Sequence, residues 1–169
     1  HLQVARALEL GELPKFRRSA GYVAYTEGWA LYAETLGFEL GLYKDPYSRF
    51  GHLQGQAFRA ARLVVDTGIH AFGWSRQRAI DWMAERTGVD VPFVSSEVDR
   101  YYSWPAQALG YMVGELKIIE LRDRAKQKLG ARFDIRQFHS VVLDQGAVPL
   151  PVLERAVDAW VASVVAAPR

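Results

Sequence analysis

The chain contains no cysteine, which excludes disulfides and every metal or nucleophile site that depends on thiolates. It also has no strong charge bias, because 21 Lys and Arg residues stand against 19 Asp and Glu residues, and no basic patch is interleaved with aromatic residues. We therefore expect no nucleic-acid partner. No apolar run is long enough to span a membrane and no signal peptide is visible, so the sequence predicts no transmembrane segment.

The residues that are present favour a helical core. Of the 169 residues, 50% are hydrophobic and 12% aromatic, which is enough for one domain with a buried core. Apolar residues recur with a helical period, and no stretch alternates convincingly as a strand does. The sequence therefore predicts an all-α fold, a bundle of about eight helices in a single domain over residues 1–169.

Capping residues and glycines set the predicted boundaries. Asp45 followed by Pro46, Ser75 and Asp134 are typical of helix starts, and Gly11, Gly41 and Gly130 are typical of helix ends. Including their caps, the predicted helices cover about 1–10, 21–40, 45–70, 75–86, 95–104, 106–129, 134–146 and 149 to near the end. Residues 12–19 are predicted to form a polar loop and residues 89–94 a short connection.

One predicted helix carries a carboxylate among apolar residues. Glu27, Leu31 and Glu34 are spaced i, i+4 and i+7, so they share one helix face. The aromatic residues around this face are Tyr22, Tyr25, Trp29 and Tyr32. Spacing alone favours a packed helix with a surface Glu at each end. The functional alternative is that Glu27 binds a metal, since burial of a carboxylate is costly unless a cation or hydrogen bonds compensate.

Several sequence blocks resemble the bacterial family catalogued as domain of unknown function 885. The matching blocks are His1-Leu2-Gln3, Tyr25–Glu34 with its Glu27-Gly28-Trp29-Ala30 signature, Asp45–Gly51, Arg62–His70, Glu97–Tyr101, Pro105–Tyr111 and Leu150-Pro151. Members of this family look like zinc metallopeptidases of the gluzincin type, and they are several times longer. The resemblance therefore implies that the chain is the C-terminal portion of a larger helical metallopeptidase-like fold.

The resemblance also implies a zinc site. Glu27 would be the third zinc ligand, and His1 would be either the second zinc histidine or the residue immediately after it. The family's His-Glu pair, which includes the general base, would lie upstream of residue 1. We therefore expect the isolated chain to be inactive and zinc to be a cofactor of the full-length protein. Ala106 stands where the family usually has Gly, which affects only the local loop.

Further site residues follow from the same resemblance. Tyr111 is the first candidate to donate a hydrogen bond to the oxyanion, and Tyr101 is the second. His70 would line the cleft and bond to the substrate or the oxyanion, although a packed or helix-capping histidine is the structural alternative.

The predicted substrate-binding residues are Gln107, one turn before Tyr111, and Arg100. Arg100 would pair with a substrate carboxylate, or it would bridge to Asp99 or Asp66. His52 and His139 are predicted to be surface residues.

The predicted function is therefore that of the C-terminal part of a zinc-dependent peptidase-like hydrolase. Its expected partners are a peptide substrate and the upstream part of the same protein. The alternatives are a non-catalytic helical module that binds peptides or a partner, and a structural domain in which Glu27 faces solvent or an Arg. A di-iron bundle is disfavoured because no paired Glu-x-x-His motif occurs.

Two further expectations concern the chain in solution. Apolar surface on residues 1–10 and 21–40 favours self-association of the isolated chain, and a strictly monomeric species in light scattering would contradict this. The location stays open between the bacterial cytoplasm and a secreted or periplasmic compartment.

Overall fold

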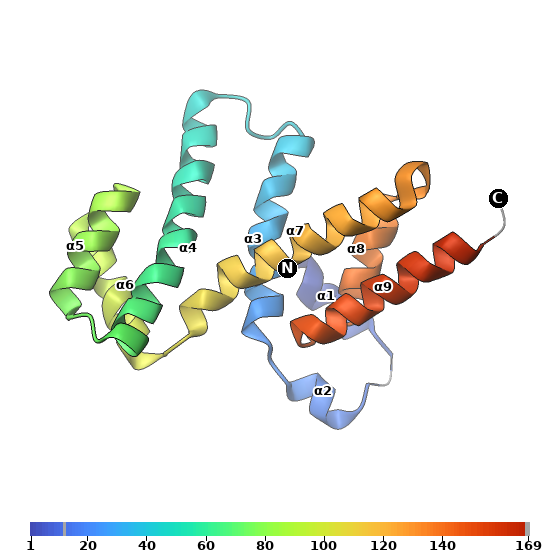
Figure 1. Ribbon diagram of the computed structural model, residues 1–169, viewed down its shortest axis with the longest axis horizontal. Coiled ribbons are helices and arrows are strands. Elements are labelled where there is room, and N and C mark those ends of the chain that lie inside the picture. The colour runs from blue at the N-terminus through green and yellow to red at the C-terminus, as the bar shows by residue number, and fades with distance from the viewer. Residues whose placement is uncertain (12, 168–169) are drawn as a thin grey trace. The chain divides into compact units, whose positions relative to one another are not determined.

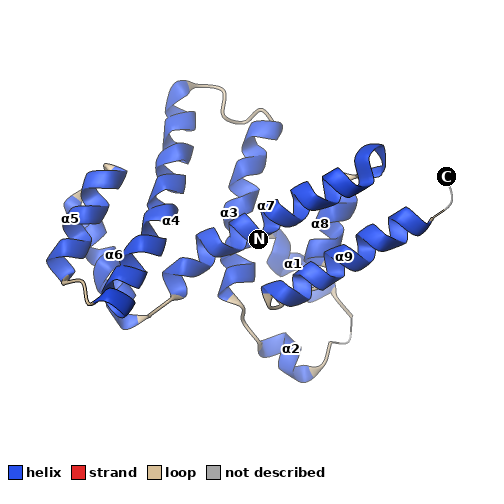
Figure 2. Cartoon of the chain, in the orientation of Figure 1, coloured by secondary structure: helices blue, strands red, loops and turns tan. Residues whose placement is uncertain are grey.

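A computed structural model describes residues 1–11 and 13–167, and these residues form helices and loops with no strand (Figures 1 and 2). The α-helices are α1 (Leu2–Glu9), α2 (Lys15–Ser19), α3 (Val23–Glu39), α4 (Pro46–Phe72), α5 (Arg76–Thr87), α6 (Val91–Ser103), α7 (Gly110–Leu129), α8 (Ile135–Leu143) and α9 (Leu150–Ala166), with 3-10 turns η1 (Gln107–Leu109) and η2 (Gly130–Arg132). The predicted all-α fold is confirmed. None of the described helices is both long and apolar enough to cross a bilayer.

The chain divides into two compact units, which are described separately. Unit 1 comprises His1–Tyr32 and Gly114–Arg169, and unit 2 comprises Ala33–Val113. Helices α3 and α7 each contribute residues to both units. The prediction of a single domain over 1–169 stays a prediction.

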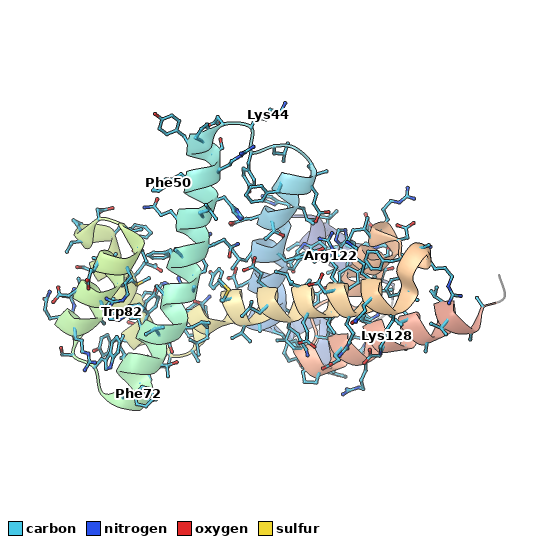
Figure 3. The ribbon with its side chains drawn as sticks, turned by 45° about the horizontal axis from the view of Figure 1, so that its top comes forward. Lys44, Phe50, Phe72, Trp82, Arg122 and Lys128 are labelled. Atoms are coloured by element: carbon cyan, nitrogen blue, oxygen red, sulfur yellow. The ribbon has the colours of Figure 1, made fainter. Side chains whose placement is uncertain are left out.

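Unit 2 is organised around α4, α5 and α6. Helix α5 packs against both α4 and α6, which joins these three helices around one core. The fully buried residues of that core include Val65, Ile80, Met83, Val94 and Val98. Partly buried indole rings cover it, among them Trp82 of α5, which Figure 3 labels. Apolar residues with helical spacing therefore meet on the inner faces of all three helices.

The capping predictions are confirmed at several helix ends. The Asp45 carboxylate accepts hydrogen bonds from two first-turn amides of α4, and the Ser75 and Asp134 side chains cap α5 and α8 in the same way. Gly73 and Gly88 end α4 and α5 in the left-handed conformation, with φ of 64° and 63°. Such residues satisfy backbone groups that a helix end leaves without partners.

In unit 1, α3 crosses α7 at two glycines. A Cβ on Gly28 would lie 2.4 Å from the Cα of Gly114, and one on Gly114 would lie 1.8 Å from the carbonyl oxygen of Ala24. The two backbones are therefore in direct contact, and no larger residue fits at either glycine. Tyr25 donates a hydrogen bond across 2.8 Å to the carbonyl of Val142 in α8, which holds α3 against this helix.

Four boundaries differ from the prediction. Residues 15–19 of the predicted polar loop form α2, whereas Glu12 lies outside the described residues. Helix α1 ends at Glu9, because Leu10 is already extended, rather than at Gly11. Helix α6 begins at Val91 instead of 95, since Asp90 caps it and Pro92 suits its first turn. Helix α7 begins only at Gly110, after η1.

Candidate functional site

Glu27 has no hydrogen-bonding or ion-pair partner among the residues that the structure describes. The residue is half-buried on α3. Glu34, two turns later on the same helix, instead pairs with Arg59 across 3.1 Å. Glu34 is therefore held by a guanidinium, whereas Glu27 has no such partner among the described residues.

Residues next to Glu27 are held by packing. Gly28 lies at the crossing of α3 and α7. Trp29 is 5% exposed, and its ring centroid lies 5.4 Å from that of His139 and 5.6 Å from that of Tyr32. The hydroxyl of Tyr32 is hydrogen-bonded to Nε2 of His139 across 2.8 Å.

Both histidines predicted at the surface are partly buried instead. His139 lies in the cluster with Trp29 and Tyr32, and His52 packs against the rings of Phe38 and Tyr43 in unit 2. Polar sequence neighbours favour exposure, but aromatic residues close in space pack against both imidazole rings.

The start of the chain lies against the turn that carries Glu27. Nε2 of Gln3 donates a hydrogen bond across 2.6 Å to the carbonyl of Thr26, the residue before Glu27. His1, two residues before Gln3, is exposed. Among the described residues, no group of three or more His, Asp and Glu residues is arranged to hold a metal ion.

A second group of predicted residues gathers around Arg62 in unit 2. The Arg62 side chain lies between the rings of Phe58 and Tyr111, with its Cζ 5.0 Å and 4.5 Å from their centroids. Its Nε donates to the hydroxyl of Tyr101 across 3.2 Å, and its Nη2 donates to Oε2 of Glu97 across 2.7 Å. Arg62 therefore joins α4 to α6 and to the start of α7.

Glu97 is the acceptor that this network shares. Its Oε1 accepts from Nε of Arg100, and its Oε2 accepts from Arg62, Arg100 and Tyr101. Burial alone would raise the pKa of Glu97, but the hydrogen bonds from Arg100 and Arg62 outweigh it and hold the pKa below its ordinary value. Burial raises the pKa of Tyr101 to about 12, so this phenol is neutral near pH 7.

Arg100 binds within the network and not to its predicted acidic partners. Its Nη1 donates to Oε1 of Gln107, and the rest of its guanidinium faces Glu97. Asp99 pairs with Arg76, and Asp66 accepts the backbone amide of Ala106. The predicted bridges from Arg100 to Asp99 or Asp66 are therefore wrong. Asp99 is one residue from Arg100, and neighbours in a helix do not face each other.

Asp66 holds an unusual loop. Its two carboxylate oxygens lie 3.2 and 3.1 Å from the amide nitrogen of Ala106. Ala106 has φ of 65°, and it is the one residue other than Gly with positive φ in the described part of the chain. Burial raises the pKa of Asp66, whereas the hydrogen bond from the Ala106 amide and electrostatic interactions with His70 and Arg100 lower it.

His70 and Tyr111 occupy different surroundings. His70 is exposed in the last turn of α4, and its Nε2 lies 3.0 Å from the carbonyl oxygen of Tyr101, so this nitrogen donates. Tyr111 is half-buried against Arg62, and its hydroxyl forms no hydrogen bond to the described residues. The predicted Tyr101, Tyr111, Arg100 and Gln107 therefore lie together in unit 2, whereas Glu27 and His1 belong to unit 1.

Sequence reasoning did not single out Arg62 and Asp66 as site residues, although both lie in a block that carries the resemblance. They are one turn apart, at i and i+4, on a helix whose intervening residues are apolar. A charged residue among apolar neighbours on a helix is also the pattern that indicates Glu27, so the same pattern indicates Arg62 and Asp66. Glu115, buried on α7 beside Gly114, was also missed.

Residues 1–157 match the family described as "Bacterial protein of unknown function (DUF885)". The chain belongs to this family. The DUF885 chain is also similar to a solved structure, "the putative lipoprotein from Colwellia psychrerythraea", with 52% sequence identity and a TM-score of 0.94. The match covers 96% of this chain and 28% of that chain, so the DUF885 chain spans little more than a quarter of the length of that protein. No curated protein is significantly similar to it.

Proposed function

We propose that this DUF885 chain is part of a zinc-dependent peptidase, to which it contributes Glu27 as a metal ligand. The observation that carries the proposal is that Glu27 is a half-buried residue whose carboxylate forms no hydrogen bond or ion pair with the described residues. Leaving a carboxylate unpaired among aromatic residues is costly, and a cation offsets that cost. Glu34 lacks this property, because Arg59 pairs with it.

The donor set of the described residues fits part of a zinc site. Carboxylate oxygen and histidine nitrogen are typical zinc ligands, and catalytic zinc commonly has three protein ligands. Glu27 supplies one, and His1 is the candidate for a second. We propose that the remaining ligands and the general base lie in other parts of a longer chain. When bound, zinc would supply an activated water and a polarised substrate carbonyl.

The residues of unit 2 have separate roles in this proposal. Tyr111 has a hydroxyl that is available to donate to an oxyanion, whereas the Tyr101 hydroxyl already bonds with Arg62 and Glu97. We therefore assign oxyanion stabilisation to Tyr111 and a positioning role to Tyr101. Arg100 donates a hydrogen bond to the side-chain oxygen of Gln107. In the proposal, these two side chains orient the peptide substrate.

The decisive experiment replaces Glu27 in the full-length protein. We expect Glu27→Gln to lower zinc content, measured by plasma mass spectrometry, at least tenfold and to abolish peptide hydrolysis. Glu34→Gln is the matched control, because it removes one carboxylate oxygen from the same helix, and it should keep both zinc and activity. Full zinc occupancy together with full activity in Glu27→Gln would show that Glu27 is not a ligand.

A non-catalytic peptide-binding module is the second candidate. Wild-type full-length protein that holds no zinc and still binds peptides would support this candidate over the peptidase. Zinc-dependent hydrolysis by the isolated 169-residue chain would contradict the expectation that the chain alone is inactive.

A further inference from the structure

A pocket of about 370 Å³ lies entirely within unit 2. One wall is a single face of α4, and the opposite side comprises Val89, Phe93 and Tyr111. The α4 residues that line it are Gly51, Gln54, Gly55, Phe58, Arg59 and Arg62. Its volume falls within the range of small-molecule sites, and the group of residues combines aromatic rings with guanidinium groups.

Two glycines keep the α4 wall open. A Cβ on Gly51 would meet nothing within 4 Å, so this position borders open space. A Cβ on Gly55 would lie 2.6 Å from Nη1 of Arg59, so its absence leaves room for that guanidinium beside the helix. Glycine inside a helix destabilises it by about 1 kcal/mol relative to Ala. These two positions therefore lower helix stability and leave the pocket open.

Arg62 lines this pocket and carries an unsatisfied donor. The Arg62 side chain is only 10% exposed, and its Nη1 is buried with no hydrogen-bond partner among the described residues. Its other two nitrogens are engaged by Tyr101 and Glu97. Both oxygens of Glu97 also accept hydrogen bonds from Arg100, and its Oε2 accepts one from Tyr101. A buried N–H without an acceptor is costly, and an acceptor from outside the network would remove that cost.

A carboxylate is the acceptor that fits this group best. Arginine binds carboxylates through strong charge-assisted hydrogen bonds, and Arg59 adds a second guanidinium to the same pocket, although Glu34 accepts from its Nη2. The rings of Phe58 and Phe93, 5.7 Å apart, provide apolar contact for the body that carries the carboxylate.

We propose that this pocket binds a carboxylate of a peptide, with Arg62 Nη1 as its donor. The carboxylate is either the C-terminus or an acidic side chain. The choice of a peptide rests on the proposed function, but the carboxylate recognition does not depend on zinc.

The test uses the full-length protein and three peptide probes in calorimetry, with a chelator present so that hydrolysis and zinc do not contribute. The probes are acetyl-Ala-Phe as a free acid, the same peptide as its C-terminal amide, and acetyl-Ala-Glu amide. We expect at least one of the two probes that carry a carboxylate to bind tenfold or more tightly than the neutral amide. The probe that binds then identifies the source of the carboxylate. Equal binding of all three probes, or no binding, would overturn the proposal.

Two variants locate the binding in this pocket. Gly51→Leu places a side chain at the open wall without touching Arg62, and a better helix former should leave the melting temperature unchanged or higher. We expect it to weaken carboxylate binding at least tenfold. Arg62→Lys keeps the charge but loses the Nη1 donor, and we expect at least fivefold weakening.

Ala57→Leu is the control, because Ala57 is exposed on α4 and does not line the pocket. It should bind like the wild type. Unchanged binding in a folded Gly51→Leu variant would overturn the proposal. If Glu27→Gln retains zinc while the acid is still preferred over the amide, the peptidase proposal fails and the carboxylate site stands.

Discussion

Arg62 and Glu97 face each other across 2.7 Å and join α4 to α6 at a point where both side chains are largely buried. Glu97 also accepts from Arg100, so one carboxylate compensates two guanidiniums. Removing one member of a buried ion pair leaves an uncompensated charge in a medium that solvates it poorly. The stability of unit 2 should therefore depend on Glu97 far more than on its surface carboxylates.

We expect Glu97→Gln to lower the free energy of unfolding by about 3 kcal/mol near pH 7. Asp99→Asn is the control, because its pair with Arg76 is exposed and such pairs contribute about 0–1 kcal/mol. Urea denaturation of the two variants measures the difference. Equal losses in both would contradict a special role for Glu97.

The same variant should show a defined pH dependence. Because the folded-state pKa of Glu97 lies below its ordinary value of 4.5, its stabilising contribution is fully present above about pH 4.5. It is lost as the pH falls through the lower folded-state pKa. The stability difference between wild type and Glu97→Gln should therefore narrow below pH 4.5 and stay constant above pH 6. A difference that grows on acidification would contradict this assignment.

Gly28→Ala should be strongly destabilising. The added Cβ would lie 2.4 Å from backbone of Gly114, which cannot move away without shifting α7. Overpacking of this kind costs about 1–3 kcal/mol or more. Gly51→Ala is the matched control, since its Cβ meets open space and should stabilise α4 slightly. Thermal unfolding distinguishes the two, and a Gly28→Ala variant as stable as the wild type would rule out the close helix crossing.

Ala106→Gly should raise stability. The left-handed conformation costs a residue with a Cβ about 1–2 kcal/mol, and glycine removes this cost. The greater conformational freedom of Gly in the unfolded chain offsets part of the resulting stabilisation. We expect a net increase of about 0.5 kcal/mol. Gly88→Ala makes the opposite change at φ of 63° and should lower stability by about 1 kcal/mol. Destabilisation of similar size in both variants would contradict backbone strain at Ala106.

Tyr111→Phe tests the proposed oxyanion donor in the full-length protein. Removing one such donor typically lowers kcat about 100-fold, while KM and zinc content should stay near their wild-type values. Tyr102→Phe is the control, because its exposed hydroxyl bonds to the backbone of Trp74. An equal effect of both variants, or an effect of Tyr111→Phe on KM alone, would remove Tyr111 from this role.

The helical elements were predictable because local signals determine them. Asp45, Ser75 and Asp134 indicate helix starts because their side chains cap backbone amides only two or three residues away. The helical period of apolar residues then predicts the rest of each helix. The start of α6 was missed although Asp90 and Pro92 give the same signal as Asp45 and Pro46. Helix α2 has only five residues, too few for a period to appear.

The candidate site was predictable only in part. Resemblance identified Arg100, Tyr101, Gln107 and Tyr111, and the structure gathers them in unit 2. Neither spacing nor resemblance indicated Arg62 as their common partner, because contacts between α4, α6 and the start of α7 depend on tertiary packing. Tertiary packing also explains why His52 and His139 are partly buried although their sequence neighbours predict exposure.

The crossing of α3 and α7 bears on how the Glu27-Gly28-Trp29-Ala30 signature should evolve. Gly28 is fixed by the neighbouring backbone and Trp29 by its buried ring, so purifying selection on folding alone would preserve both. Glu27 has no such structural reason to persist. Under the proposed function, lineages that lost the metal site should therefore keep the Gly-Trp pair while the preceding position drifts, so the residue at position 27 would distinguish metal-binding members of the family from the others.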